Sequence, residues 1–309
     1  MGTAMAGIAT IAYTQEALTG ASHKKVGPRF IPKILGNIAA ANIAIDYNIQ
    51  GPSFTVSTAC SSGGDAINTA CMCMQSGKAD IMLAVGAESV LCPLVIYSLA
   101  NAKALSRRND SPSTASRPFD VTRDGFVIGE GGGALVLETE EHALARGAKI
   151  YAEIRGCGNT DDAYHVTAPH PEGRGAIACM KQAIAEAGIN PSDIGYINAH
   201  GTATNKGDTV ETSSIKKVFG NTLPYVSSTK GATGHMMGAG GITETITCVK
   251  AIETGTVPPT INLNEVDPEC AGIDFVANTA KKAEINFAMS NAFGFGGQNS
   301  SIIVGKYGK

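Results

Sequence analysis

Short apolar runs rich in β-branched residues alternate along the chain with longer stretches of helical periodicity. In the first half, runs at Phe54–Ala59, Ile81–Val85 and Gly133–Leu137 predict strands, and Gly63–Gly77 predicts a helix. This alternation is typical of β-α-β units around a buried, mostly parallel sheet. The first half is therefore predicted to be an α/β structure.

A second series of the same kind follows a charged, helix-like stretch at Glu140–Arg146. The predicted strands are Ile150–Ile154, Gly195–Ala199, Tyr225–Ser228, Phe287–Asn291 and Asn299–Val304, and the predicted helices are Gly175–Gly188, Asp208–Phe219 and Gly238–Glu253. Two such series predict two similarly built halves, 1–140 and 141–309. The polar stretches Arg107–Arg123 and Asp161–Arg174 have no strong period, which predicts loops that carry function or cover a site.

Composition narrows the class of protein. The chain has 309 residues, of which 43 % are hydrophobic and 37 are glycine, as expected of a densely packed enzyme. Its net charge of −3 is spread without long runs, so there is no electrostatic signal for nucleic acid or an anionic membrane, although a small patch for an acidic carrier protein stays possible. The eight cysteines lack paired C-x-x-C spacing and no secretory leader is evident, which predicts reduced thiols in a cytoplasmic protein without a metal site.

One cysteine lies where a predicted strand meets a predicted helix. Cys60 stands in the small-residue segment STACSSGG at 57–64, at the positive end of that helix. A helix terminus stabilises a thiolate, so we expect the pKa of Cys60 to fall and the residue to act as a nucleophile. The alternative is a buried structural cysteine, since free cysteine is among the most buried residue types.

Two histidines and a lysine follow other predicted strands. His200 lies in NAHGTAT at 198–204, and Lys230 and His235 lie in STKGATGH at 228–235. Parallel-sheet enzymes place reactive groups at the carboxyl ends of strands. Each residue alone fits a core or surface position, but their shared placement after strands favours a catalytic site with Cys60.

A glycine-rich segment lies between the last two predicted strands, with the sequence NAFGFGGQN at 291–299. Its backbone amides carry little side-chain cover, which suits close approach to an oxyanion or an acyl chain. An ordinary turn between two strands is the alternative.

Four motifs in this order carry a specific resemblance: ACSSG at 59–63, AHGTAT at 199–204, STKGATGH at 228–235 and NAFGFGG at 291–297, with RPFD at 117–120 and RDGFVIGEGGG at 123–133. Over essentially its whole length the chain resembles the elongating β-ketoacyl-acyl-carrier-protein synthases, most of all the bacterial type II enzymes of fatty acid synthesis. The resemblance implies a thiolase-like α/β fold of two similar halves with mixed five-stranded sheets. The family's usual chain begins earlier, with a central strand of the first half, so we expect that half to be incomplete and the 309-residue chain alone to be poorly stable. Gln298 also departs from the family, which more often has threonine there.

The resemblance also assigns roles to residues. It implies that Cys60 holds the acyl chain as a thioester, and that His200 and His235 assist decarboxylation of malonyl carrier protein. It implies an oxyanion hole from the backbone amides of Cys60 and Phe295, with Phe295 also gating the cysteine. The supporting residues are Lys230 paired with Glu244 as organisers, Thr202 and Thr204 for the phosphopantetheine arm, and Met5 and Leu99 for the acyl pocket. Met5 and Leu99 fit ordinary core positions equally well.

The same resemblance implies the partners and excludes some relatives. The implied substrates are carried on the phosphopantetheine of an acyl carrier protein, with no bound cofactor or metal. A homodimer is implied along Pro52–Ala59, with Phe30 and Ile31 near the partner subunit's acyl pocket. A degradative thiolase needs a second cysteine in the last glycine loop, which 291–299 lacks; an initiating synthase uses one histidine and an asparagine; and a noncatalytic chain-length partner lacks the nucleophile.

The expected function is decarboxylative condensation in fatty acid elongation, favoured by DDAYHVTAP at 161–169. The open alternatives are a type II polyketide ketosynthase and an inactive fragment or half of a split ketosynthase.

Overall fold

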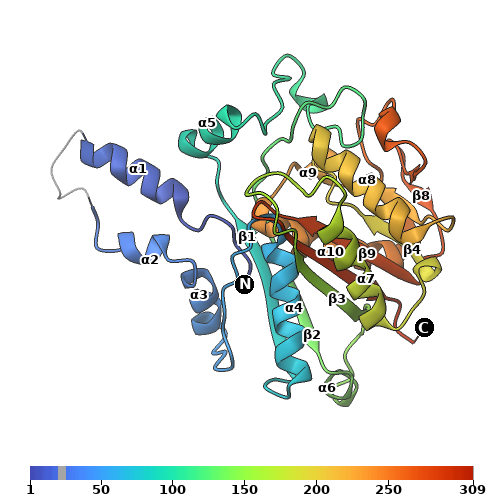
Figure 1. Cartoon of the computed structure of the whole chain (residues 1–309). Coiled ribbons are helices and arrows are strands. Elements are labelled where there is room, and N and C mark those ends of the chain that lie inside the picture. Colours follow the sequence, from blue (N-terminus) through green and yellow to red (C-terminus); the bar gives the residue numbers. More distant parts are fainter. Residues whose placement is uncertain (20–25, 309) are drawn as a thin grey trace.

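The computed structural model describes residues 1–19 and 26–308. Its two main sheets have helices between and outside them (Figure 1), and a third sheet consists of two short strands, β6 and β8. In the first half the elements are α1 (Ile8–Thr19), α2 (Phe30–Ile34), α3 (Ile38–Asp46), α4 (Ser62–Gln75), β1 (Ile81–Glu88), α5 (Pro93–Asn101), β2 (Gly131–Glu138) and α6 (Glu140–Ala145). In the second half they are β3 (Glu153–Asp161), α7 (Arg174–Ala187), β4 (Ile194–Asn198), α8 (Asn205–Phe219), β5 (Tyr225–Ser227), α9 (Lys230–Thr233), α10 (Gly240–Thr254), β6 (Thr256–Val257), β7 (Asp274–Phe275), β8 (Lys281–Lys282), β9 (Phe287–Phe293) and β10 (Gln298–Gly305).

The larger sheet has the strand order β3-β10-β9-β4-β5-β7. Strands β9, β4, β5 and β7 run parallel, whereas β10 is antiparallel to both β3 and β9. The sheet is therefore mixed, as the family resemblance implies. It is also mostly parallel, as the alternation of elements predicts, because three of its five strand pairings are parallel and only β10 runs against its neighbours. Five strands have three or more residues, and the sixth, β7, has two.

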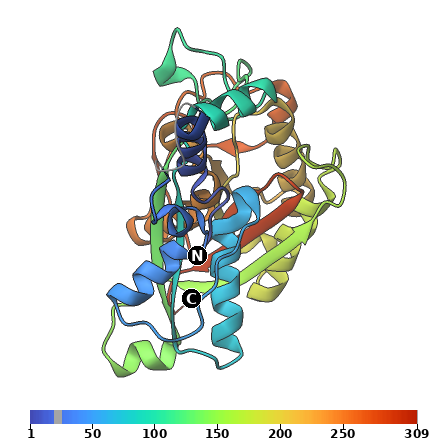
Figure 2. The same cartoon turned by 90° about the vertical axis from the view of Figure 1, so that its left-hand side faces the viewer.

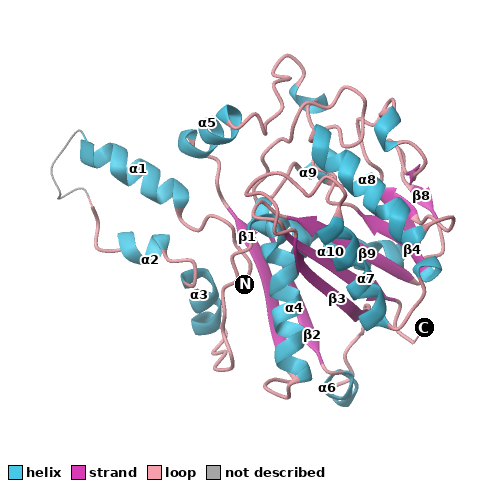
Figure 3. Cartoon of the chain, viewed as in Figure 1, coloured by secondary structure: helices cyan, strands magenta, loops and turns pink. Residues whose placement is uncertain are grey.

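Helices α4 and α10 lie between the two sheets and separate them (Figure 3). Helix α10 packs on β9 and β10 on one side and on β1 and β2 on the other, while α4 packs on β1 and β10. The buried side chains of this layer include Ile67, Ile242 and Ile302. Helices α7 and α8 cover the other face of the larger sheet through Met180, Ile215 and neighbouring apolar residues. This stacking brings the amino ends of α4 and α10 together.

Glycines allow that close approach. A Cβ atom on Gly63 would lie 2.7 Å from the Ile242 nitrogen, and one on Gly241 would lie 2.5 Å from the Gly64 nitrogen. Neither position can carry a side chain without separating the helices. The glycines therefore fix the distance between the segment that precedes α4 and the loop that precedes α10.

The smaller sheet consists of β1 and β2, paired antiparallel, and is extended at one point by the amino-terminal segment. Gly2 forms parallel bridges to Val56 on one side and to Gly86 on the other. The strand predicted at Phe54–Ala59 is wrong in extent. Within 1–19 and 26–308 its strand-like pairing is with Met1–Thr3 alone, and Ala59–Ser61 already forms a 3-10 turn. Beyond Gly2 a groove between Phe54 and β1 holds a cavity of about 100 Å³ with an apolar lining that includes Ile43, Ile81 and Leu83.

Helices α1, α2 and α3 lie at one side of the molecule, away from the larger sheet (Figure 2). Their described residues are half-buried or exposed, and Ile31, Ile45 and Tyr47 are exposed apolar side chains among them. Among the residues in 1–19 and 26–308, no helix has the length and apolarity to cross a membrane.

The other predicted elements are found close to their expected bounds. The helix predicted at Gly63–Gly77 is α4, and the one predicted at Gly175–Gly188 is α7. The strand expected at Ile150–Ile154 begins only at Glu153, because that edge of the sheet pairs with β10 from Glu153 onward. The thiolase-like α/β class is confirmed by the solved structures described below.

Candidate active site

Cys60 lies on a tight turn at the amino end of α4. Ala59 before it has a φ of 50°, in the left-handed region, and Ala59–Ser61 forms a 3-10 turn that leads into the helix. Small hydroxyl side chains hold this turn: Ser61 Oγ donates to the Thr58 carbonyl at 2.7 Å, and Ser62 Oγ donates to the Ala59 carbonyl at 2.7 Å. The small residues around Cys60 thus provide the hydrogen bonds that keep the turn sharp.

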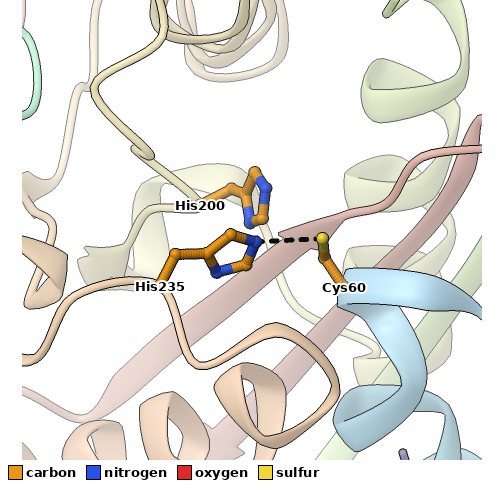
Figure 4. Close-up of side chains that lie close together, drawn as sticks. All are labelled: Cys60, His200 and His235. Carbon is orange, nitrogen blue, oxygen red and sulfur yellow. Dashed lines mark hydrogen bonds between the residues drawn. The ribbon is translucent and has the colours of Figure 1, made fainter. Parts of the chain in front are cut away.

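The thiol of Cys60 meets both predicted histidines (Figure 4). Nε2 of His235 lies 2.9 Å from the Cys60 sulfur. This sulfur, one ring nitrogen of His200 and one ring nitrogen of His235 all lie within 4.8 Å of one another. The two imidazole rings are edge to face, with centroids 5.3 Å apart. Three segments far apart in sequence therefore converge on one point.

Burial controls the charge of all three groups. It raises the pKa of the Cys60 thiol to about 11, although the Lys230 charge and a hydrogen bond from the Phe295 backbone oppose this rise. Burial also holds the pKa of His200 and of His235 well below the usual range, and the charge of Lys230 lowers both further. The expected fall in the pKa of Cys60 is wrong because desolvation outweighs the stabilising groups. The resting site is a neutral thiol beside two neutral imidazoles.

Lys230 and Glu244 form a buried ion pair behind the histidines. Nζ of Lys230 hydrogen-bonds to Glu244 Oε1, and the two residues are 1 % and 4 % exposed. Neither lines the cavity described below. The pair expected between these residues is present, and it brings a positive charge close enough to keep the histidines neutral.

The last glycine loop packs directly on the cysteine turn. A Cβ atom on Gly294 would lie 2.9 Å from the Thr58 carbonyl oxygen and 3.3 Å from the Cys60 nitrogen. The backbone N–H of Phe295 hydrogen-bonds to the thiol. The amide of Phe295 therefore faces the Cys60 sulfur.

A cavity of about 720 Å³ opens over these groups. Cys60, His200 and His235 line it, and so do all five predicted substrate-binding residues, Met5, Leu99, Thr202, Thr204 and Phe295. Thr202 and Thr204 share a hydrogen bond of 3.1 Å between their hydroxyls, and Phe295 is 39 % exposed. The cavity is large enough for an extended apolar chain with a polar arm.

Several buried acids support the site and were missed from the sequence. Glu211, in α8, accepts the backbone N–H groups of His200 and Gly201 at 2.8 Å and 2.7 Å. Asp208 accepts those of Phe119 and Ala203 and lies 3.6 Å from Arg123. Glu88, at the end of β1, accepts four hydrogen bonds. The sequence offered one sign of these three acids: each is an acidic residue at a position where the helix face or strand end is otherwise buried.

The same three side chains must be considered as metal ligands, because a cysteine and two histidines are a ligand set for zinc. With Zn–S near 2.3 Å and Zn–N near 2.0 Å, a tetrahedral ion holds sulfur and nitrogen roughly 3.5 Å apart. The 2.9 Å between Cys60 Sγ and His235 Nε2 is instead a hydrogen-bond distance. The observed spacing fits a nucleophile and its base better than a metal centre.

Comparisons with known proteins agree with this geometry. The model of the β-ketoacyl synthase N-terminal domain matches residues 1–143, and that of the C-terminal domain matches residues 151–264. The 3-oxoacyl-[acyl-carrier-protein] synthase 2 of Rhizobium meliloti (strain 1021) is 45% identical over 99% of this chain and 73% of its own length. A β-ketoacyl synthase from Burkholderia phymatum STM815 superposes with a TM-score of 0.92 at 36% identity, covering 99% of this chain and 74% of that one. A type II polyketide ketosynthase in complex with its acyl-carrier protein gives a TM-score of 0.92 at 35% identity, covering 97% and 74%. On the evidence of these matches the chain belongs to the β-ketoacyl synthase family.

Proposed function

We propose that this chain catalyses the decarboxylative condensation of a carrier-bound acyl chain with malonyl carrier protein, giving a 3-oxoacyl carrier protein in fatty acid elongation. The observation that carries the proposal is the 2.9 Å contact between Cys60 Sγ and His235 Nε2, at the base of a cavity that His200 also lines. The first relative above bears the name of this activity.

In the first half-reaction the sulfur of Cys60 attacks the thioester carbonyl of the acyl carrier. The thiol proton passes to Nε2 of His235, and the carbonyl oxygen becomes an oxyanion that the amides of Cys60 and Phe295 stabilise. When the oxyanion collapses, the bond to the carrier sulfur breaks and that sulfur leaves with a proton. The acyl chain is now a thioester on Cys60.

In the second half-reaction malonyl carrier protein enters and loses carbon dioxide. The electron pair of the broken bond moves into an enolate, whose oxygen accepts hydrogen bonds from His200 and His235 as neutral donors. The enolate carbon attacks the acyl thioester, a carbon-carbon bond forms, and the Cys60 sulfur leaves. The low histidine pKa values support this role, because a neutral imidazole offers an N–H to the enolate without first releasing a proton.

The test is reconstitution with acyl and malonyl carriers, measuring the 3-oxoacyl product. Cys60→Ala abolishes product formation, whereas Cys92→Ala, in the same buried cluster and 1 % exposed, retains it. Condensation by Cys60→Ala would remove the nucleophile from the mechanism. A product extended repeatedly without reduction of its keto groups would favour the polyketide alternative, to which the polyketide ketosynthase neighbour gives weight.

We further propose that the partner is an acyl carrier protein and that its phosphopantetheine arm reaches Cys60 past Thr202 and Thr204. The proposed location of the reaction is the cytoplasm. The exposed side chains of Lys103 and Lys206 line the same cavity and suit an acidic carrier. Charge reversal at Lys206 is expected to raise KM for the carrier more than it lowers kcat.

We propose that the chain divides into the halves 1–140 and 141–309, of which the first carries Cys60 and the second carries both histidines.

We also propose a homodimer whose subunits meet along Pro52–Ala59. Phe54 and Ile31 are 49 % and 56 % exposed, which is a large apolar exposure for an isolated subunit. Sedimentation of a folded sample as a monomer at all concentrations would contradict the dimer.

A further inference from the structure

Glu88 is a buried carboxylate without a positively charged partner in the described part of the chain. It ends β1 and is 6 % exposed. Oε1 accepts hydrogen bonds from Thr3 Oγ1 at 3.0 Å and from the Met5 backbone N–H at 3.1 Å. Oε2 accepts them from the backbone N–H groups of Ala4 at 2.6 Å and Gly238 at 3.0 Å. Both oxygens are therefore satisfied by donors from two separate loops.

These two loops form part of the cavity wall. Ala4 and Met5 line the cavity on one side, and Met237, next to Gly238, lines it on the other. Met237 follows His235 by two residues and is 5 % exposed. Glu88 thus joins the amino-terminal wall of the cavity to the loop of His235.

The packing around Glu88 leaves no space for adjustment. A Cβ atom on Gly238 would lie 2.7 Å from Glu88 Oε2 and 2.6 Å from the Ala4 nitrogen. A Cβ atom on Gly2 would lie 2.2 Å from the Ser62 carbonyl oxygen, in the cysteine turn. The segment Gly2–Met5 is therefore held between that turn and the His235 loop, and the carboxylate supplies its acceptors.

We propose that Glu88 is a positioning residue that sets the acyl chain-length selectivity of the cavity by holding the wall at Ala4 and Met5 against the His235 loop. The proposal rests on the proposed condensing function and adds to it the residue that fixes the dimensions of the acyl site. Glu88 itself does not touch the substrate; it acts through Met5.

The variant Glu88→Gln tests this because the amide has one acceptor where the carboxylate has two. The favourable orientation places the amide oxygen at the Oε2 position, where it still accepts from Ala4 and Gly238. Thr3 can rotate its hydroxyl to accept from the NH2 group, but the Met5 N–H then faces a donor. An unpaired buried N–H moves toward water, so the wall at Met5 opens.

The first measurement labels Cys60 with N-alkylmaleimides of graded alkyl length, which needs neither carrier nor condensation. In Glu88→Gln the labelling rate for long chains, divided by the rate for short chains, rises about tenfold. A change of this size is expected when an apolar pocket gains contact with one or two more methylene groups of the chain. Labelling by iodoacetamide stays unchanged, since that reagent does not reach the wall. The second measurement is kcat/KM for acyl carriers of graded length, in which the same ratio rises.

Glu130→Gln is the matched control. Oε1 of Glu130 accepts from the Leu91 N–H at 2.6 Å and from Ser89 Oγ at 3.1 Å, and a glutamine oxygen can accept both. Glu130 is exposed and does not line the cavity, so its variant keeps the chain-length profile. If Glu88→Gln fails to fold, Glu88→Asp keeps the charge, withdraws the acceptor by one methylene and shifts the ratio in the same direction.

An unchanged maleimide profile in a folded Glu88 variant, a uniform fall at every chain length, or a shift toward short chains would overturn the proposal. Failure of carrier acylation in the unsubstituted protein would instead refute the condensing function. The maleimide profile would still measure the wall in that case.

Discussion

Replacing Lys230 by methionine removes the cation of the buried pair. It leaves the Glu244 side chain without its only hydrogen-bond partner among the residues that the structure describes. Nζ of Lys230 contacts Oε1 of Glu244, and Oε2 of Glu244 is buried without any partner in the described residues. Methionine keeps most of the lysine volume, so the main effect is electrostatic. The backbone of Lys230, which accepts from Ser116 Oγ at 2.6 Å, is not affected.

The free energy of unfolding should fall by about 3 to 5 kcal/mol, the cost of removing one partner of a buried ion pair. That is a large part of the roughly 5 to 15 kcal/mol that stabilises a typical domain. Burial already raises the pKa of Glu244, and without Lys230 the carboxyl takes up a proton more readily. When the pKa of an acid is higher in the folded than in the unfolded state, its contribution to the free energy of unfolding is most favourable at low pH. That contribution is lost as pH rises through the folded pKa, so the variant recovers stability as pH falls.

Urea unfolding at about pH 7 and about pH 5 measures both effects. The double variant Lys230→Met/Glu244→Leu removes the orphaned carboxyl and should regain most of the loss. Lys149→Met is the exposed control. Lys149 pairs with Glu253 at 2.7 Å and its side chain is 65% exposed, so its loss should change the free energy of unfolding little. A loss at Lys230 no larger than that at Lys149, or one that grows as pH falls, would refute the reasoning.

Three further predictions follow from the site. His235→Ala should slow release of carbon dioxide from malonyl carrier protein by about 10²- to 10⁴-fold, and release at the normal rate would exclude His235 from that step. Gly294→Ala places a Cβ atom 2.9 Å from the Thr58 carbonyl oxygen and should slow acylation of Cys60. In the control Gly51→Ala the new Cβ atom has no neighbour within 4 Å, so the acylation rate should not change. Equal acylation rates in the two variants would contradict the packing argument. Burial raises the pKa of Glu211 to about 7, so its contribution to stability is lost as pH rises through that value, and the slope of unfolding free energy against pH should be shallower in Glu211→Gln.

The main elements of the fold were predictable because their sequence patterns are local. Apolar periodicity located α4 and α7 within two residues at each end, and the turn before α4 was evident from small residues around Cys60. The segment Phe54–Ala59 was mispredicted because strand formation depends on a partner. Its apolar pattern suits a strand, but in the described part of the chain Met1–Thr3 alone supplies backbone groups that pair with it as a strand.

Some residues of the candidate site were likewise predictable from local sequence patterns, and others were not. Cys60, His200 and His235 were identified from their positions after strands, and they meet at one point because the amino ends of α4 and α10 converge. Glu88 and Glu211 were not identified, because each acts on backbone groups that the fold brings to it from distant segments. The pKa of Cys60 was also mispredicted, since the helix terminus is a local feature whereas burial depends on the whole cavity.

That raised pKa determines how the nucleophile must work. Burial raises the pKa of the Cys60 thiol to about 11 and holds the pKa of His235 well below its usual range, so desolvation favours the neutral pair over a thiolate-imidazolium pair. In the proposed mechanism the Cys60 sulfur therefore attacks from the thiol state, and its proton moves to His235 as the bond to the acyl carbon forms. The oxyanion then draws on the amides of Cys60 and Phe295, so stabilisation is greatest in the transition state. In the proposed second half-reaction a neutral His235 that carries its proton on Nε2 donates to the enolate, and the buried charge of Lys230 favours the neutral state in both histidines.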